Sequence, residues 1–371
     1  MSIGISYHGG EGFARASMAT PGQSHLDPGS AAGHPVAVEA EQLAAYLRHR
    51  MPSATGITVS DVARIPGGAS RETWSFDARW SDERGAAVER GFIVRRDPTG
   101  SLLESNAGLE FELYTALAGS GIPVPDVHWI ERDGAWLERP FFVMGRLPGA
   151  TDARTLCTAP EWADVRPTVA RQKAEILARI HRVDVDTIPL LDRPPSPADA
   201  ASYEIERWER TMRADTLEPQ PVLELALSWL KRHLPPPPER LALVHADYRT
   251  GNFLYDKTGI TGILDWEMAH AGDPIEDLGW LVIKSWRWAG DDRVGGLCTR
   301  DDFVRMYEEA GGVKVDPEVL RFWEVFSNVK FAVIFITGTK AVVQGTTPDL
   351  LLALTAFINP SIEVELLELI G

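Results

Sequence analysis

Residues 243–254 read LVHADYRTGNFL, and this stretch contains the polar cluster that decides the fold. Its form is H-x-D-x-x-x-x-N, with His245, Asp247 and Asn252 set among apolar residues of the kind that form buried strands. Thirteen residues beyond Asn252, the segment ILDWE places Asp265 at the end of a second apolar strand. A carboxylate that directly follows apolar strand residues is costly to bury unless it is paired or used in chemistry. The pattern therefore predicts a functional site that contains Asp247, Asn252 and Asp265.

These residue types suit the transfer of a phosphoryl group from a nucleotide. Such a transfer needs a carboxylate that orients the attacking hydroxyl, hard oxygen ligands for Mg²⁺, and a cation that reaches the phosphates. Asp247 can supply the first, and Asn252 with Asp265 can supply the second. For Asn252 the structural alternative is stabilisation of a turn beside Gly251.

The ordered set of motifs resembles a known group of enzymes. The H-x-D-x-x-x-x-N motif, the strand ending in I-x-D-W-E and the segment GDPIEDL at residues 272–278 are similar to the pattern of aminoglycoside phosphotransferases and choline kinases. The resemblance extends over roughly residue 57 to the C-terminus and implies a protein-kinase-like fold of class α+β. Residues 95–98 (RRDP) and 322–326 (FWEVF) look like the branch of this family that is associated with acyl-CoA dehydrogenases.

The resemblance assigns roles to the residues of the quoted motifs. Asp247 matches the catalytic base, and His245 is the second catalytic candidate, with scaffolding of the loop as its alternative role. Asn252 and Asp265 match the ligands of Mg²⁺. Asp277 is expected to brace the catalytic loop without touching substrate.

The resemblance also implies nucleotide-binding positions in the N-terminal part. The segment GGASRET at residues 67–73 occupies the place of the phosphate-covering loop, so Gly67, Gly68 and Ser70 are candidate contacts of the nucleotide. Gly68 leaves room for backbone N–H groups to approach phosphates, although an ordinary hairpin turn is the alternative. Met144 lies at the expected connection between the two lobes, where backbone groups can meet an adenine edge.

One position departs from the family pattern. The segment FIVR at residues 92–95 stands where the family has V-A-I-K, so Arg95 replaces the lysine that binds phosphate. Arginine keeps the charge and can bind phosphate through two N–H groups, but its reach differs. Arg96 competes for the role; we favour Arg95 because it alternates onto the same strand face as Ile93. Its expected ion-pair partner is Glu110, with Glu112 as the alternative.

Hydrophobic periodicity predicts the order of the elements. A period of two dominates residues 57–95, and a helical period dominates after Met144, apart from a short β interruption between Leu241 and Asp265. The expected elements of the first part are a helix at 38–50, three antiparallel strands within 57–95, a helix at 106–117, and strands at 127–131 and 140–144. These elements predict a disordered leader (1–35), a small N-terminal lobe with an antiparallel sheet and one helix (36–145), and a larger, mainly helical C-terminal lobe with the catalytic, metal and acceptor sites (146–371).

Composition restricts the class of protein further. The 371 residues are 44% hydrophobic and 24% charged, which is typical of a soluble globular protein. The net charge of −16 argues against a general nucleic-acid binder, because phosphate backbones require a basic surface. Two cysteines, the absence of a secretory signal and a longest apolar run of only residues 331–337 lead us to expect a cytoplasmic protein that does not span a membrane.

Together these patterns predict a kinase that uses ATP or GTP with Mg²⁺ to phosphorylate a hydroxyl group of a small molecule. Relatives use aminoglycosides, macrolides, choline-like alcohols and hydroxyacyl-CoA thioesters, and the branch named above favours a metabolic alcohol or a hydroxyacyl-CoA. Two alternatives stay open: a metal-dependent phosphohydrolase and a non-catalytic kinase-like nucleotide-binding protein. The P-loop, Rossmann, α/β-hydrolase and zincin motifs do not occur. The tryptophans expected near the acceptor site are Trp280, Trp286, Trp288 and Trp323.

Overall fold

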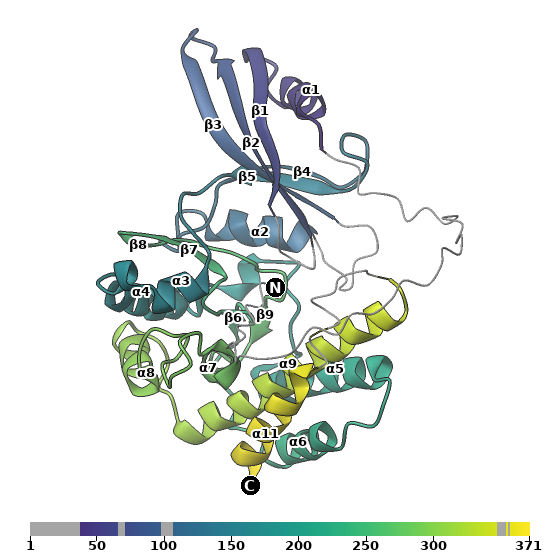
Figure 1. Ribbon diagram of the computed structural model, residues 1–371, viewed down its shortest axis with the longest axis vertical. Coiled ribbons are helices and arrows are strands. Elements are labelled where there is room, and N and C mark those ends of the chain that lie inside the picture. The colour runs from purple at the N-terminus through teal and green to yellow at the C-terminus, as the bar shows by residue number, and fades with distance from the viewer. Residues whose placement is uncertain (1–37, 66–70, 98–106, 347–353, 355–356) are drawn as a thin grey trace, which may run out of the picture.

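The computed structural model describes residues 38–65, 71–97, 107–346, 354 and 357–371. A part that contains a twisted sheet lies above a larger helical part (Figure 1). We call the first part the N-lobe; its elements are α1 (Ala40–Arg50), β1 (Thr55–Ile65), β2 (Glu72–Ser81), β3 (Ala87–Arg96), α2 (Ala107–Leu117), β4 (Val127–Glu131) and β5 (Phe141–Gly145).

The N-lobe sheet is antiparallel throughout, with the strand order β1-β2-β3-β5-β4. Strands β2 and β3 form a long hairpin whose register runs from Glu72 opposite Arg96 to Ser81 opposite Ala87. The hairpin closes at Asp82, whose Oδ1 accepts hydrogen bonds from the backbone N–H groups of the following turn. This turn fixes the register and therefore fixes which side chains of β3 face the C-lobe.

Successive residues of β3 and β5 point to opposite faces of the sheet, as the period of a strand requires. On one face, Val94 and Val143 belong to a hydrophobic cluster with Leu43 and Leu47 of α1. On the other face, Ile93 belongs to a separate and larger cluster that includes α2 and extends into the C-lobe. Figure 1 shows α2 between the sheet and the helices of the C-lobe. The functional motifs of the two lobes therefore meet on the α2 side of the sheet.

The C-lobe contains helices and two short two-stranded sheets, β6 with β9 and β7 with β8. Its helices are α3 (Ala153–Thr158), α4 (Arg166–Ile180), α5 (Ala200–Asp215), α6 (Pro221–Arg232), α7 (Ile275–Val282), α8 (Arg300–Glu309), α9 (Pro317–Val343) and α11 (Asn359–Ile370). The short strands are β6 (Ala242–Val244), β7 (Phe253–Asp256), β8 (Gly259–Ile263) and β9 (His270–Gly272). Single 3₁₀ turns lie at η1 (Pro160–Trp162), η2 (Val185–Thr187), η3 (Pro197–Asp199) and η4 (Lys284–Trp286).

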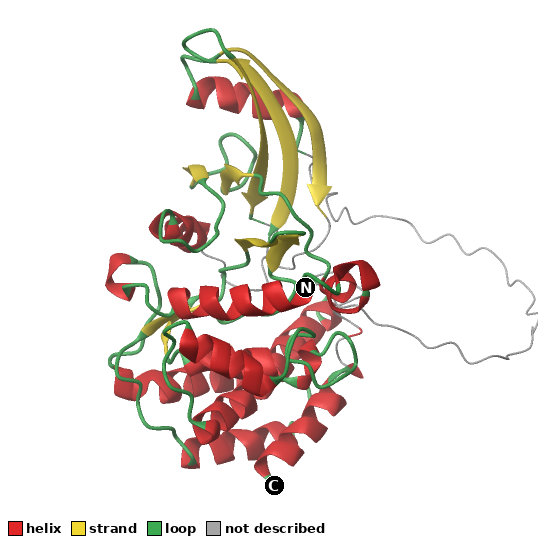
Figure 2. Ribbon diagram, turned by 90° about the vertical axis from the view of Figure 1, so that its left-hand side faces the viewer, coloured by secondary structure: helices red, strands yellow, loops and turns green. Residues whose placement is uncertain are grey.

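Helix α9 is the central helix of the C-lobe. It contacts α5, α6, α7 and α11, and nearly every residue from Phe322 to Phe335 is buried. A second view shows the helices of the C-lobe gathered below the sheet, while α1 lies beside its upper end (Figure 2). Because α9 packs against α7, which follows the same segment, side chains of α9 can reach the residues that follow β6. Among the described residues, none of the helices combines the length and the apolar character required to cross a membrane.

The predicted fold class is confirmed: an antiparallel sheet with an added helix precedes a mainly helical region. The first three strands extend from Thr55 to Arg96, slightly beyond the predicted range of 57–95, and the β region of the C-lobe continues past Asp265 to Gly272. Strands β4 and β5 lie within one residue of their predicted bounds, and the connection between them includes the buried Leu137. The expected leader lies outside the described residues, and the boundary between residues 145 and 146 stays a prediction.

Candidate active site

The loop from His245 to Asn252 begins at the end of β6 and leads into β7. The ring of His245 is fully buried, and burial holds its pKa below the ordinary value. Its Nδ1 accepts a hydrogen bond from the backbone N–H of Asp247 at 3.3 Å, and its Nε2 lies 2.9 Å from the carbonyl oxygen of Leu264. Both ring nitrogens are therefore engaged with the backbone. This geometry favours the scaffolding role of His245 over a catalytic one.

Asp277 of α7 holds the same loop from below. Its Oδ2 accepts from the backbone N–H of His245 and its Oδ1 from that of Ala246, each at 2.8 Å. Ala246 has a φ of 65°, a left-handed conformation that costs about 1–2 kcal/mol for a residue other than glycine. Burial raises the pKa of Asp277. The hydrogen bond with His181 and the interactions with His181 and His245 lower it by more, so the pKa lies below its ordinary value. The expectation that Asp277 braces the loop is confirmed.

Asp273 has a more local function. Its Oδ1 accepts a hydrogen bond from the backbone N–H of Ile275 at 2.9 Å, at the beginning of α7. The sequence Asp273-Pro274 predicts a helix start with Asp273 as the N-cap and Pro274 at the first helical position, but α7 begins at Ile275 with Pro274 as its N-cap, so Asp273 lies one residue before the expected position.

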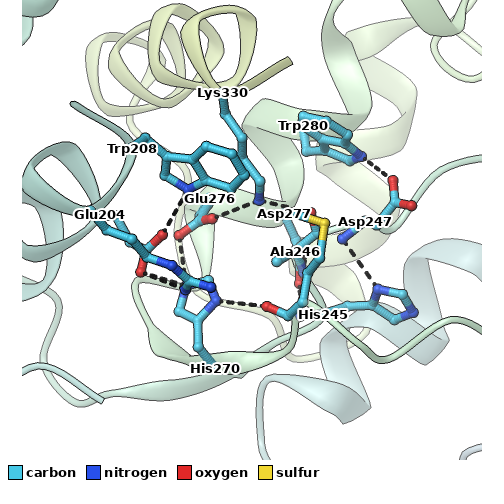
Figure 3. A network of polar contacts seen from close by, with 12 residues as sticks. Glu204, Trp208, His245, Ala246, Asp247, His270, Glu276, Asp277, Trp280 and Lys330 are labelled. Atoms are coloured by element: carbon cyan, nitrogen blue, oxygen red, sulfur yellow. Dashed lines mark hydrogen bonds and ion pairs between the residues drawn. The ribbon is translucent and has the colours of Figure 1, made fainter. Parts of the chain in front are cut away.

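The carboxylate of Asp247 receives hydrogen bonds from three side chains. Oδ1 accepts from Nε1 of Trp280 at 2.8 Å and from Nε of Arg249 at 3.2 Å. Oδ2 accepts from Nδ2 of Asn252 at 2.5 Å. The Asp247 side chain is nevertheless 19% exposed, so a substrate hydroxyl can still reach it. The hydrogen bond from Trp280, drawn in Figure 3, was not predicted, although Trp280 was expected near the acceptor site.

Asn252 and Asp265 come together through the β7–β8 hairpin. Phe253 pairs with Ile263, and the N–H of Leu264 donates to the carbonyl of Asn252 at 2.9 Å, so Asp265 begins one residue beyond this contact. Asp265 itself has a φ of 60°, and its side chain is 38% exposed. The amide nitrogen of Asn252 donates to Asp247, so its side-chain oxygen is the atom that would remain for a cation. An amide oxygen and a carboxylate are donors that Mg²⁺ accepts, so this pair fits the expected metal.

Arg95 reaches Asp265 from the N-lobe. Its Nη1 lies 3.2 Å from Oδ1 of Asp265, and its Nη2 lies 3.4 Å from the carboxylate of Glu110 in α2. Burial raises the pKa of Asp265, but attraction to Arg95 and Arg249 outweighs it, so the pKa lies below its ordinary value. Glu110 is fully buried and also pairs with Arg71 at 2.6 Å. Glu110, and not Glu112, is thus the helix partner of Arg95.

Arg96 points to the other face of β3. Its Nη2 lies 2.6 Å from Glu72 on the neighbouring strand, and both side chains are buried there. Arg95 is therefore the arginine of this pair that faces the catalytic loop.

Of the remaining nucleotide-binding candidates, only Met144 belongs to the described residues. Met144 lies inside β5, opposite Ile93 of β3 and Val127 of β4, so its backbone has a strand on each side. The strand pairing continues to Arg146, whose N–H donates to the carbonyl of Gly91 at 2.9 Å. Three candidates lie outside the described residues: Gly67, Gly68 and Ser70.

Three of the four tryptophans expected at the acceptor site lie close together beside Asp247. The ring centres of Trp280 and Trp286 are 5.4 Å apart, those of Trp286 and Trp288 are 6.1 Å apart, and the guanidinium of Arg249 lies 4.9 Å from the ring of Trp286. Trp323 is different, because it is fully buried in α9 and packs on Phe322 and Phe326.

A second polar cluster, which the sequence analysis did not identify, lies below the loop. It contains Glu204, His270, Glu276 and Lys330, all nearly inaccessible to solvent (Figure 3). One signal was present in the sequence: Lys330 is a single cation within an apolar part of a long helix.

Comparison with known sequences gives a family match. The profile of the phosphotransferase enzyme family matches residues 61–323. Acyl-CoA dehydrogenase family member 10 of Mus musculus is 29% identical over 240 residues, which cover 59% of this chain and 22% of that protein. Acyl-CoA dehydrogenase family member 11 of Rattus norvegicus is 24% identical over 304 residues, 78% of this chain and 37% of that protein. The chain thus spans less than two fifths of these relatives. Viomycin phosphotransferase of Streptomyces vinaceus is 30% identical over 155 residues, 38% of this chain and 49% of that enzyme.

Comparison with solved structures supports the same fold. A crystal structure from Ralstonia eutropha JMP134, assigned to the aminoglycoside phosphotransferases, has a TM-score of 0.68 at 22% identity and covers 89% of this chain and 97% of that one. Aminoglycoside phosphotransferase APH(4)-Ia, in a ternary complex with AMP-PNP and hygromycin B, has a TM-score of 0.58 at 18% identity, with 89% and 98% covered. At these identities the likeness shows the fold.

Proposed function

The chain belongs to the phosphotransferase enzyme family, and we propose that it transfers the γ-phosphoryl group of ATP or GTP to a hydroxyl group of a small molecule. The observation that carries this proposal is the arrangement around Asp247. Its carboxylate is oriented by three N–H donors, Asn252 lies beside it, and Asp265 lies one residue beyond the backbone contact with Asn252. Transfer of a phosphoryl group depends mainly on such positioning.

In the proposed mechanism, Asp247 orients the acceptor hydroxyl and takes its proton. The acceptor oxygen forms the new bond to the γ-phosphorus while the bond to the bridging oxygen breaks, and the nucleoside diphosphate leaves. Asn252 and Asp265 would hold Mg²⁺, which supplies positive charge next to the phosphates. His245 keeps the loop in place through its two backbone contacts.

On the nucleotide side, we propose that Arg95 binds phosphate oxygens while Glu110 orients its guanidinium. The backbone around Gly67, Gly68 and Ser70 would cover the phosphates. The adenine edge would lie against the chain just after Met144, beyond the strand pairing that continues to Arg146.

We further propose that the acceptor is a metabolic alcohol, with a hydroxyacyl-CoA as the leading class, and that the protein works in the cytoplasm. The named relatives support the acceptor class, because their matched region is part of proteins called acyl-CoA dehydrogenase family members. The charge of Arg249, which lies next to the stacked rings of Trp286 and Trp288, is also compatible with an acceptor that carries negative charge.

The test is a screen of acceptors for consumption of ATP, carried out with the wild-type protein and with Asp247→Asn. We expect an acceptor-dependent loss of ATP in the wild type and a decrease of kcat by about 10²–10⁴ in the variant, because the proton acceptor is removed. Both proteins should gain thermal stability with ATP and Mg²⁺. Asp301→Asn, an exposed substitution in α8, is the matched control and should leave kcat unchanged.

Each alternative function predicts a different result of this test. A phosphohydrolase would release phosphate without any acceptor. A non-catalytic binding protein would consume no ATP with any acceptor, and turnover retained in Asp247→Asn would contradict the role of Asp247.

A further inference from the structure

The buried cluster below the catalytic loop joins four separate elements. Glu204 comes from α5, His270 from β9, Glu276 from α7 and Lys330 from α9, and each side chain is at most 2% exposed. Nε2 of His270 lies 3.1 Å from Glu276 and 3.8 Å from Glu204, and Nζ of Lys330 lies 3.3 Å from Oε1 of Glu276. We call these four residues the tetrad; Figure 3 shows them around the indole of Trp208.

The charges within the tetrad are balanced, and Glu204 also pairs with the partly exposed Arg207 at 3.4 Å. Nδ1 of His270 lies 3.1 Å from the carbonyl oxygen of Met268, and Nε2 faces Glu276. Both of these partners are acceptors, so both ring nitrogens must carry a proton and the ring is an imidazolium. Two carboxylates therefore face two cations. Although burial lowers the pKa of His270, the two glutamates outweigh burial and raise it to about 9, in agreement with this geometry.

The tetrad has one outward contact with the catalytic loop. Nζ of Lys330 donates a hydrogen bond to the carbonyl oxygen of Ala246 at 2.8 Å. The backbone N–H of Ala246 donates to Asp277. Ala246 is thus held on both sides while it adopts a left-handed conformation. The left-handed conformation is unfavourable for alanine, so these two contacts are needed to stabilise it.

The orientation of Ala246 matters because the next residue is Asp247. The peptide group whose oxygen contacts Lys330 also carries the N–H of Asp247, so a rotation at Ala246 would turn the backbone of the proposed base. Lys330 also contacts the residue that orients the Asp247 side chain. Its Nζ lies 4.9 Å from the ring of Trp280, and the indole N–H of Trp280 donates to the Asp247 carboxylate.

We propose that Lys330 is a positioning residue for Asp247. The other members of the tetrad keep the ammonium group of Lys330 charged and directed at the Ala246 carbonyl. This inference rests on the proposed function, because it concerns the geometry of the same base. Lys330 lies beyond residues 61–323, the segment that the family profile matches.

The ligand atoms of Glu204, His270 and Glu276 are close enough to hold a metal ion. The protonated ring of His270 and the ammonium of Lys330 already supply the positive charge at this place, so we assign the cluster to positioning.

The first experiment compares kcat and KM in the wild type, Lys330→Met and Lys340→Met. Methionine keeps most of the length of the side chain and removes the charge. Lys340 is the matched control, because it also belongs to α9 and pairs with a carboxylate, Asp215, at 2.8 Å. We expect kcat of Lys330→Met to fall at least tenfold while KM for the nucleotide changes less than twofold. Lys340→Met should stay within twofold in both constants. An unchanged kcat in folded Lys330→Met, or an equal loss in Lys340→Met, overturns the proposal.

Two double variants separate positioning from stability. In Lys330→Met/Glu276→Gln the charge balance is restored, so we expect the melting temperature to recover while kcat stays low. In Lys330→Met/Ala246→Gly the left-handed conformation no longer carries a steric cost, so we expect part of kcat to return. Full recovery of kcat with the first double variant would show that Lys330 contributes only stability, and no recovery with the second would contradict the role of Ala246.

A spectroscopic measurement keeps the inference testable even if no acceptor is phosphorylated. The indole N–H signal of Trp280 in a ¹⁵N-tryptophan spectrum, assigned with Trp280→Phe, reports the hydrogen bond to Asp247. We expect this signal to shift in Lys330→Met and to remain in place in Lys340→Met. An inactive wild type with the expected shift would refute the proposed function alone, whereas an unmoved signal in Lys330→Met would refute the positioning role.

Discussion

Nη1 of Arg95 lies 3.2 Å from Oδ1 of Asp265, and this ion pair connects the end of β3 in the N-lobe with the acid that follows β8 in the C-lobe. The residue proposed to bind phosphate therefore contacts a residue proposed to bind Mg²⁺. A nucleotide with its metal would lie between them and would exchange this direct contact for contacts with its phosphates. The pair thus marks where the triphosphate is expected.

Arg95→Met should raise KM for the nucleotide about tenfold or more, because a charge-assisted contact with phosphate is removed. Arg95→Lys should have an intermediate effect, since it keeps the charge but not the two-pronged geometry. Steady-state kinetics with varied ATP measures both. Arg96→Met is the control: it removes the buried pair with Glu72, so it should lower the melting temperature with little effect on KM. A similar rise of KM in Arg96→Met would contradict this assignment.

Asp277→Asn should destabilise the protein by about 3–5 kcal/mol, because its fully buried carboxylate accepts two backbone hydrogen bonds and faces His181. An amide cannot accept at both positions. Chemical denaturation measures the free energy of unfolding. Asp273→Asn is the matched control with a predicted loss below about 1 kcal/mol, since asparagine begins helices as well as aspartate does. Equal losses of unfolding free energy in the two variants would contradict a larger contribution of the Asp277 contacts to stability.

Trp280→Phe should lower kcat about tenfold with little change in KM for the nucleotide. The ring is kept, but the hydrogen bond to the charged Asp247 is lost, and such bonds contribute about 1.5–3 kcal/mol. Trp323→Phe, a core substitution in the same lobe, should alter stability and leave kcat within twofold. If Trp280→Phe keeps the full kcat, the indole does not orient Asp247.

The difference in melting temperature between wild type and His270→Gln should depend on pH. The folded state raises the pKa of His270 to about 9 through Glu204 and Glu276, despite burial and the nearby Lys330, whereas an unfolded histidine titrates near 6.5. The stabilisation is therefore complete below about pH 6.5 and disappears as the pH rises through about 9. Thermal melts from pH 6 to 10 should show the gap between the two proteins closing. A gap that stays constant or widens with pH would contradict the imidazolium in the tetrad.

The order of strands and helices could be predicted because it follows from local patterns. The alternation of apolar residues in β2 and β3 and the spacing within residues 245–252 both depend on near neighbours in the chain. The closeness of Asn252 and Asp265 also follows from a short hairpin between them.

Contacts between distant segments could not be predicted in this way. No local pattern connects Ala246 with Lys330, which follows 84 residues later, or Asp247 with Trp280. The burial of Leu137 between β4 and β5 was not predicted either, because it depends on packing in the N-lobe and not on its neighbours in the chain. The roles of the individual site residues remain predictions for the experiments above.

The position of Lys330 has a consequence for the order in which the protein matures during synthesis. The ribosome completes the whole stretch 245–252 long before it adds α9, so the nascent chain carries every residue of the motif without the donor for the Ala246 carbonyl. The left-handed turn at Ala246 becomes favourable only after the C-terminal helices have folded against it. A nascent chain arrested before Pro317 should therefore contain a folded sheet while the Ala246 carbonyl still lacks its donor, so the orientation proposed for Asp247 becomes available only after α9 has been added.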